Sequence, residues 1–419
     1  MISCAIVQPD YPSKTDRKVS IDARVVTKRH GAGRLDHALT LEAQQDGSRL
    51  WTKTITFGVD APFDVPDLTT LDPFLIASLF PAMGLGGTLR IHGPVSRQLL
   101  RNVIDYQSAW SLAAPEHCRL FELEAAEIAD VSDQGGGRTI VALSGGVDSL
   151  LALFRNASGD AGPTGHDIRA TMMIHGMATG REDNADPTPL IDDLRSLSAN
   201  FDLPMAIVDT NITEVVGMHY ISHATWLASC LGLFSEIFDV GLIGSSVPFY
   251  DPGWEVYGSH PLLDPFLSSG KMAFRDDEGL YGRVDKVGLL SNYPAALEKL
   301  RVCLHPFRAG RNCCRCEKCI RTMLSFIASG NEIPESAFPQ GLRPQDIGIG
   351  LGQKIALELV PGMLAAAERN GTGDRPEIQA LREAYRHKRR KVIAKDWLKR
   401  LGGKQKPPHW QVLEKVPPG

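Results

Sequence analysis

The hydrophobic pattern divides the chain into three regions. In residues 1–134, short apolar runs predict strands and longer ones predict helices. The predicted strands are Trp51–Val59, Thr88–His92 and Arg119–Glu124, and the predicted helices are Leu71–Leu79 and Ser96–Trp110. Pro81 and the glycines after it are expected to end the first helix. We therefore predict an N-terminal α+β accessory domain over residues 1–134.

A different pattern begins after the glycines at 135–137. Short runs rich in β-branched residues alternate with helical stretches. The predicted strands are Arg138–Leu143, Thr171–His175, Pro204–Thr210 and Asp239–Ser245, and the predicted helices are Leu150–Phe154 and Ile221–Phe238. This alternation predicts an α/β fold with a doubly wound parallel sheet over residues 135–330. Such sheets bind their ligands beyond the carboxyl ends of the strands.

Residues 331–419 are predicted to form a helical and basic C-terminal extension. Positions 386–406 hold ten Lys and Arg residues and a single acid, Asp396. This charge is compatible with a solvated helical face, a protein-docking surface or a nucleic-acid contact. The sequence leaves these three interpretations open.

Composition narrows the class of protein. The 419 residues are 43% hydrophobic and 22% charged, which excludes a disordered, coiled-coil or collagen-like chain. The net charge of −4 excludes a polycation built as a whole for nucleic acid. The longest apolar stretches, around Phe74–Met83 and Trp226–Phe234, have about half the length of a membrane helix. With no export signal at the N-terminus, we expect a cytoplasmic protein without a membrane partner.

The hexapeptide Ser144-Gly145-Gly146-Val147-Asp148-Ser149 lies between a predicted strand and a predicted helix. A helix N-terminus presents unpaired N–H groups, and glycines let the backbone approach an oxygen-rich ligand. Ser144 and Ser149 add hydroxyl donors. The element is therefore predicted to bind pyrophosphate. Asp148 would repel phosphate, so we expect it to order the loop or help to hold Mg²⁺.

Five of the eight cysteines fall within 17 residues. Four of them are spaced Cys303-x9-Cys313-x2-Cys316-x2-Cys319. Four thiolates suit a structural Zn²⁺ site. An iron–sulfur cluster and a set of buried structural cysteines are the alternatives. Cys314 is expected to be a non-ligand, with a redox or sulfur-carrying role as the alternative.

The hexapeptide resembles the pyrophosphate loop (PP-loop) of the N-type ATP pyrophosphatases. Together with the cysteine spacing, it resembles the 7-cyano-7-deazaguanine synthase family over residues 136–330. That family uses ATP to adenylate 7-carboxy-7-deazaguanine, which ammonia converts to an amide and a second ATP-dependent dehydration converts to a nitrile. The overall layout of the chain is closer to that of the larger synthase-like proteins of anti-phage defence operons. Those proteins have been proposed to join a deazaguanine to a protein amine.

The resemblance implies roles for particular residues. Ser144, Asp148, Ser149 and Lys286 would be catalytic, and the loop with His175 and Lys286 would bind ATP. Cys303, Cys313, Cys316 and Cys319 would bind Zn²⁺. The family's base-recognition segment is replaced by residues 245–264, which we interpret as either a substrate pocket or an ordered surface loop. The substrate-binding candidates are Ser245, Tyr250, Asp251, Trp254 and His260, and the candidate bases for the amine step are His223 and His260.

Two other functions remain open at this point. In a tRNA-thiolating PP-loop enzyme, Cys314 would carry sulfur and the basic extension would contact RNA phosphates. In a non-catalytic scaffold, zinc would stabilise a nucleotide-binding fold. We expect a deazapurine-type small-molecule substrate, and a protein substrate or operon partner. A nucleic-acid partner is less favoured, and the sequence allows a homodimer.

Overall fold

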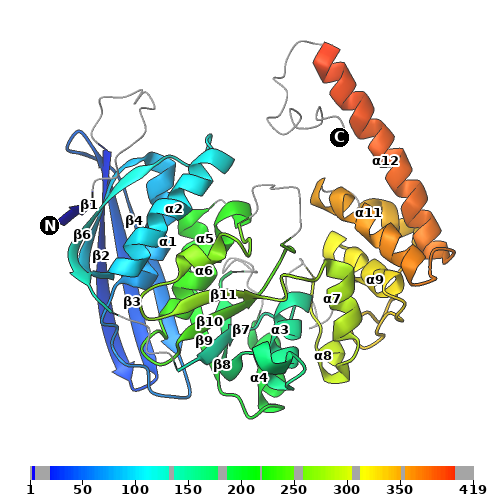
Figure 1. Ribbon diagram of the computed structural model, residues 1–419, viewed down its shortest axis with the longest axis horizontal. Coiled ribbons are helices and arrows are strands. Elements are labelled where there is room, and N and C mark those ends of the chain that lie inside the picture. Colours follow the sequence, from blue (N-terminus) through cyan, green and yellow to red (C-terminus); the bar gives the residue numbers. More distant parts are fainter. Residues whose placement is uncertain are drawn as a thin grey trace. The chain divides into compact units, whose positions relative to one another are not determined.

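The structure is a computed structural model that describes residues 2–4, 19–131, 136–177, 186–217, 219–249, 258–303, 312–350 and 354–401 (Figure 1). The chain divides into two compact units. The first comprises residues 1–313 and 334–339, and the second comprises residues 314–333 and 340–419. Within the described helices, none is both long and apolar enough to cross a membrane.

The first unit contains a sheet of 11 strands, in the order β1-β6-β5-β2-β3-β4-β9-β8-β7-β10-β11. The first six in sequence are β1 Ile2–Cys4, β2 Val19–Gly31, β3 Arg34–Gln45, β4 Ser48–Asp60, β5 Gly87–Ser96 and β6 Phe121–Ala129. The others are β7 Arg138–Ala142, β8 Asp167–His175, β9 Met205–Thr210, β10 Val240–Gly244 and β11 Ala273–Asp277. All neighbours from β9 to β11 are parallel, which confirms the predicted α/β class with a mostly parallel central sheet.

The order in which the chain adds the parallel strands to the sheet reverses once, at β7. The chain passes from β7 to β8 and β9 on one side, then returns to place β10 and β11 on the other side of β7. Helix α3 (Val147–Ala157) connects β7 to β8, and α4 (Thr188–Ala199) connects β8 to β9. Helix α6 (His219–Gly232) precedes β10. In open parallel sheets, the crevice at such a switch point is where ligands bind. The loop after β7 and the residues after β10 therefore share the position expected of a binding site.

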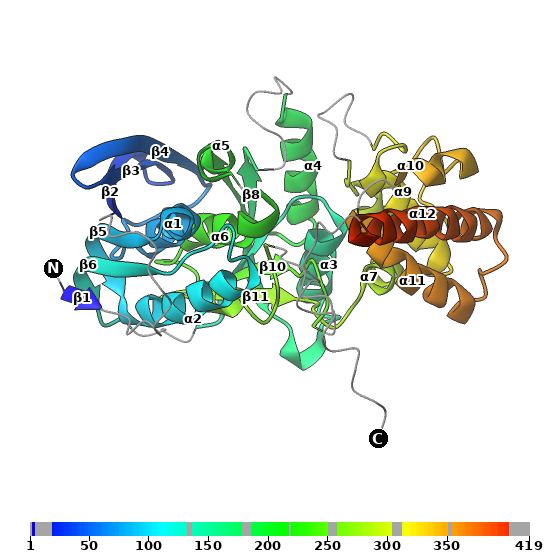
Figure 2. The ribbon, with the colours of Figure 1, turned by 90° about the horizontal axis from the view of Figure 1, so that it is seen from above.

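The N-terminal strands extend this same sheet. Strands β2, β3 and β4 are antiparallel, and β4 pairs with β9 through partners such as Phe57 and Thr210. The two regions that the sequence predicts as separate domains thus contribute to one sheet within one unit. Helix α1 (Asp72–Leu85) is buried almost all round, which its uniformly apolar sequence explains. Figure 2 shows β2, β3 and β4 on one side of α1, and α2 (Arg97–Ala113) on another.

Several boundaries differ from the sequence expectations. Pro81 does not end α1, because the helix continues to Leu85 and ends at Gly86, which has a φ of 73°. Helix α6 ends at Gly232 rather than Phe238. Strands β2, β3 and β11 were not predicted: β2 is exposed from Val26 to Gly31, β3 has a buried histidine at position 37 beside an alanine at 38, and β11 has five residues. The other helices of this unit are α5 Ile212–Val216, α7 Arg283–Leu290 and α8 Pro294–Glu298.

The second unit is helical, and it includes α9, which precedes the predicted C-terminal extension at 331–419. Its helices are α9 Glu317–Ala328, α10 Ile347–Gly350, α11 Lys354–Arg369 and α12 Pro376–Leu401. The Asn370 side chain donates to the carbonyl of Ala328 at 2.9 Å, which joins the end of α11 to the end of α9. Ile378 and Leu381 of α12 are completely buried. Farther along α12, Arg386, Arg389 and Arg390 are exposed.

Candidate functional site

The loop Ser144–Ser149 follows β7 and leads directly into α3. The Ser149 Oγ lies 3.1 Å from both the backbone N and the Oγ of Ser144, and 3.2 Å from the carbonyl of Gly146. The N–H of Gly146 donates to the Ser144 Oγ at 3.4 Å. The two serines therefore fold the loop back on itself at the N-terminus of α3. The helix dipole is positive at this end and favours an anion.

Two glycines make this geometry accessible. Gly145 has a φ of +77°, a left-handed conformation that glycine adopts without strain. Gly244, at the end of β10, packs directly on the loop, since a Cβ added there would lie 2.2 Å from the Asp148 carbonyl oxygen. At the switch point, the backbone at the end of β10 is therefore in direct contact with the backbone at the start of α3. Only glycine permits this approach at position 244.

Lys286 and Arg283 bring α7 to the loop. The Arg283 guanidinium donates to Asp148 Oδ2 at 2.9 Å, and the Lys286 Nζ lies 3.5 Å from Asp148 Oδ1. Lys286 also donates to the carbonyl of Ser245. Lys286 is only 1% exposed, and burial lowers its pKa, an effect that Asp148 partly opposes. Asp148 is therefore an anchor between α3 and α7, which supports a role in ordering the loop.

A buried acidic pair extends this network behind Lys286. Asp276 lies on β11, and burial raises its pKa to about 6 against the opposing effects of Asp264, Lys286 and Ser245. Asp264 is 1% exposed, and burial, together with the negative charge of Asp276, raises its pKa well above the usual range. The Ser259 hydroxyl donates to Asp264 Oδ2 at 2.6 Å. The pair therefore holds a proton at pH values where an exposed aspartate has lost it.

The segment before the cysteines contacts the same loop. The backbone N–H of Arg301 donates to the carbonyl of Gly145 at 2.7 Å. A Cβ added at Gly145 would meet Leu194 of α4 at 3.4 Å and the Arg301 Cβ at 3.6 Å. Lys299 pairs with Asp193 of α4 at 2.7 Å. The loop is thus enclosed by α4, α7 and residues 299–301.

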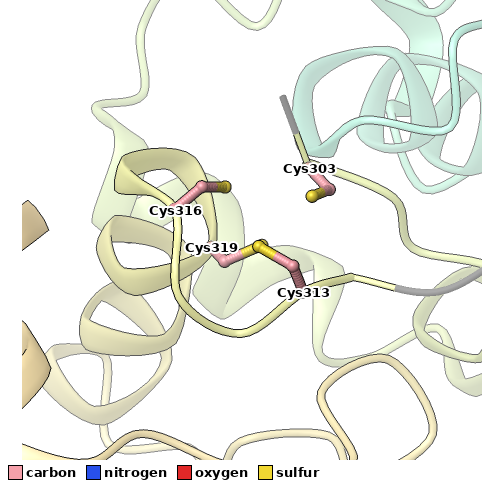
Figure 3. A group of neighbouring side chains, drawn as sticks. All are labelled: Cys303, Cys313, Cys316 and Cys319. Carbon is pink, nitrogen blue, oxygen red and sulfur yellow. The ribbon is translucent and has the colours of Figure 1, made fainter. Parts of the chain in front are cut away.

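Four cysteine side chains converge on one space (Figure 3). The sulfur atoms of Cys303, Cys313, Cys316 and Cys319 all lie within 4.8 Å of one another. A tetrahedral Zn²⁺ with bonds of about 2.3 Å separates its sulfurs by roughly 3.8 Å, so this donor set fits the ion. Cys316 is the residue before α9, and Cys319 lies in the first turn of that helix. The cluster could therefore hold a metal ion such as zinc.

Asn312 holds the backbone of Cys303 in place beside Cys313. Its Oδ1 accepts the backbone N–H of Val302 at 2.9 Å and that of Cys303 at 3.2 Å. Its Nδ2 donates to the carbonyls of Leu300 at 2.9 Å and Ala337 at 3.1 Å. Asn312 is 4% exposed and directly precedes Cys313. An asparagine beside a cysteine carries no motif of its own, so sequence reasoning missed it.

The structure brings together some of the predicted site residues. The loop, Lys286 and Ser245 form one network, whereas His175 lies at the end of β8 and pairs with Asp209 at 3.3 Å. His260 Nδ1 accepts the N–H of Leu262 at 3.2 Å, and His223 lies against Gly258. Cys314 is 2% exposed, with a φ of +57°. The substrate candidates Tyr250, Asp251 and Trp254 lie outside the described residues.

Sequence reasoning missed Arg283, Arg301 and Asp276, and it placed Asp264 in the 245–264 segment without predicting its proximity to Asp276. No residue pattern distinguishes these side chains from other polar residues before the chain folds. The only available signal was the position of Asp276 near the end of an unrecognised strand. Comparisons with protein-family models, curated proteins and solved structures found no match.

Proposed function

We propose that the protein is an ATP-dependent ligase that adenylates a carboxylate and transfers the acyl group to an amine. The observation that carries this proposal is the Ser144–Ser149 loop at the switch point of a parallel sheet, with the Lys286 ammonium held beside it. Backbone N–H groups, serine hydroxyls and a buried cation together suit a pyrophosphate leaving group. The sheet topology, the loop and the four cysteines together support the likeness to PP-loop enzymes.

In this proposal, a carboxylate oxygen of the substrate attacks the α-phosphorus of ATP. The bond from that phosphorus to the bridging oxygen of the β-phosphate breaks, and pyrophosphate leaves. The loop N–H groups and Lys286 stabilise the charge that develops on the departing pyrophosphate. Mg²⁺ bound to the phosphates would neutralise further charge there.

The second step joins the acyl group to an amine. The amine nitrogen attacks the carbonyl carbon of the acyl adenylate, and the bond from that carbon to the AMP oxygen breaks. An ammonium group loses two protons overall as it becomes an amide nitrogen. By resemblance, we propose a deazapurine carboxylate as the acid, and a protein amine as an acceptor larger than ammonia, with a role in anti-phage defence. Zinc on the four cysteines is proposed to be structural, since it leaves no open coordination position.

The test is ATP–pyrophosphate exchange with 7-carboxy-7-deazaguanine as the acid. Ser149→Ala removes the hydroxyl on which the Ser144 N–H and Oγ converge, and Lys286→Met removes the buried cation. Each variant is expected to lower the exchange rate by about 100-fold or more. Thermal unfolding of each variant reports whether it is folded.

The matched control is Ser158→Ala, which removes a serine hydroxyl at the far end of the same helix, where it contacts Phe154 and Asp160. Exchange should be unchanged in this variant. If folded Ser149→Ala and Lys286→Met variants exchanged pyrophosphate at the wild-type rate, the assignment of the loop as the ATP-binding site would be contradicted.

A further inference from the structure

Residues 300–303 form a strap that joins the four-cysteine cluster to the loop at 144–149. The Arg301 N–H donates to the Gly145 carbonyl at 2.7 Å, and Cys303 contributes its sulfur to the cluster. Only Val302 lies between these two residues of the strap. A shift of Cys303 is therefore transmitted to the loop through a very short length of chain.

Asn312 braces the strap. Its Nδ2 donates to the Leu300 carbonyl at 2.9 Å, and its Oδ1 accepts the N–H groups of Val302 and Cys303 at 2.9 and 3.2 Å. The next residue along the chain is Cys313, a second member of the cluster. The place of the strap beside the loop thus depends on how these two cysteines are held.

The Arg301 hydrogen bond sets the direction of a donor in the loop. The Gly145 carbonyl and the Gly146 N–H belong to one trans peptide group, so they point in opposite directions. Holding the carbonyl toward Arg301 therefore turns the N–H toward the Ser144 Oγ, 3.4 Å away. A hydrogen bond of this length is weak, so the N–H is readily given to a phosphate oxygen. The strap thus keeps this donor among the groups proposed to bind pyrophosphate.

Glycine on both sides makes the same peptide group easy to rotate. Gly145 has a φ of +77°, and Gly146 has a φ of −80° and a ψ of 167°. Rotating the peptide changes mainly ψ of Gly145 and φ of Gly146, and glycine tolerates wide ranges of both torsions. The rotated group would direct the Gly145 carbonyl, which carries partial negative charge, toward the anion. The two orientations therefore differ in affinity for phosphate, and the Arg301 N–H favours the one that binds it.

A metal ion would fix the cysteine end of the strap. Coordination bonds give each of the four sulfurs a set position around the ion. Without the ion these bonds are absent, and Cys303 and the strap have more freedom. Binding of the metal and the orientation of the peptide between Gly145 and Gly146 are therefore parts of one equilibrium.

We propose that metal bound at the four cysteines favours the loop orientation that binds ATP, so that zinc and ATP bind cooperatively. By linkage, each ligand then raises the affinity of the other by the same factor. Arg301 is a positioning residue, because it acts on the loop through its backbone N–H. This inference rests on the proposed function, since that function brings the ATP phosphates to the loop.

The test uses the full chain, with zinc bound and after its removal, in excess Mg²⁺. Calorimetry measures the affinity for ATP in both states, and competition with a chromophoric chelator measures the zinc affinity with and without ATP. We expect ATP to bind about tenfold more tightly to the zinc-loaded protein, and ATP to raise the zinc affinity by the same factor. Far-ultraviolet circular dichroism shows whether the zinc-free chain is folded.

Asn312→Ala releases the strap while zinc stays bound. At saturating zinc, this variant should bind ATP about tenfold more weakly than wild type, at the level of the zinc-free protein. Asn331→Ala, which removes side-chain hydrogen bonds to Ser329, is the matched control and should bind ATP like wild type. Because zinc is bound in both variants, this comparison tests the strap even where the zinc-free chain unfolds.

The outcomes distinguish this inference from the proposed function. A mutual and equal increase in affinity that Asn312→Ala abolishes would support it. Equal ATP affinity of the folded protein with and without zinc would overturn it and leave the proposed function intact, as would full ATP affinity of Asn312→Ala at saturating zinc. Failure of ATP to bind even the zinc-loaded chain would overturn both.

Discussion

Asp276 gives the molecule a specific dependence on pH. Its pKa is raised to about 6 by burial, so the neutral carboxyl is the form that the folded state prefers. Its contribution to stability is fully present below the unfolded pKa near 3.8 and is lost as the pH rises through 6. The loss amounts to about 3 kcal/mol of unfolding free energy.

This contribution is measured by comparing wild type with Asp276→Asn in chemical denaturation from pH 4 to pH 7. The wild-type unfolding free energy should decline more steeply with rising pH than that of the variant. Asp46→Asn, at an exposed turn, should follow wild type. Parallel pH profiles of wild type and Asp276→Asn would show that the carboxyl ionises normally.

Asn312 is expected to act on the metal site through Cys303. Asn312→Ala removes the acceptor for the Val302 and Cys303 N–H groups, so the first ligand loses its fixed position. We expect zinc affinity to fall by about 10- to 100-fold, measured by competition with a chromophoric chelator. Asn331→Ala, which removes side-chain hydrogen bonds to Ser329, should keep wild-type affinity. Equal affinity in both variants would show that Asn312 does not position the ligand.

At the scale of residues, the sequence predicted the residues of the motifs and missed the residues that hold those motifs in position. The loop and the four cysteines are local patterns whose chemistry follows from residue type and spacing. Asn312, Arg283 and Asp276 act through contacts formed by folding, and no local pattern distinguishes them from other polar residues. The cysteine cluster is confirmed as a group that could bind metal, whereas the catalytic roles remain predictions.

Among the elements, the contact between β10 and α3 leaves no room for a side chain at position 244. Gly244→Ala would place a methyl group 2.2 Å from the Asp148 carbonyl, so the loop or the strand must move. We expect a loss of about 1–3 kcal/mol in unfolding free energy, together with weaker ATP binding. Gly84→Ala, on the exposed side of α1 with open space around it, should be neutral or slightly stabilising. Denaturant titration of the two variants provides the comparison, and equal stability would contradict the close packing.

The sequence predicted the elements best where one periodicity dominated. The short β-branched runs at β7 and β9 were recognisable because both faces are buried. The second half of β2 is exposed at every position, and β3 has a histidine at a buried position, so neither shows a clean apolar–polar alternation. A proline inside a helical pattern is expected to end the helix, but α1 continues through Pro81. Tertiary packing around this largely buried helix outweighs the local preference of proline.

At the scale of the whole molecule, the N-terminal region is part of the same sheet as the parallel strands rather than an appendage. Strand β4 pairs with β9, and the Ser229 hydroxyl of α6 donates to the carbonyl of Pro73 in α1 at 2.7 Å. Local periodicity could not predict this continuity, because strand pairing between distant segments leaves no local trace. The length of the chain suggested extra domains, whereas the N-terminal region widens the sheet of the first unit.

A chain that starts at residue 136 is therefore expected to be insoluble when expressed alone. Removing the N-terminal region exposes the edge of β9 and the apolar face of α6 that α1 covers. Co-expression of residues 1–131 as a separate chain should restore solubility. A soluble, cooperatively folding 136–419 fragment would contradict the single-sheet architecture as a folding unit.

The central claim is that the loop at the switch point directs cleavage of ATP between its α- and β-phosphates. The most direct measurement follows ATP labelled separately at the α- and γ-phosphates during turnover with the carboxylate and an amine. We expect the α-label in AMP and the γ-label in pyrophosphate. Release of ADP and inorganic phosphate would contradict the account.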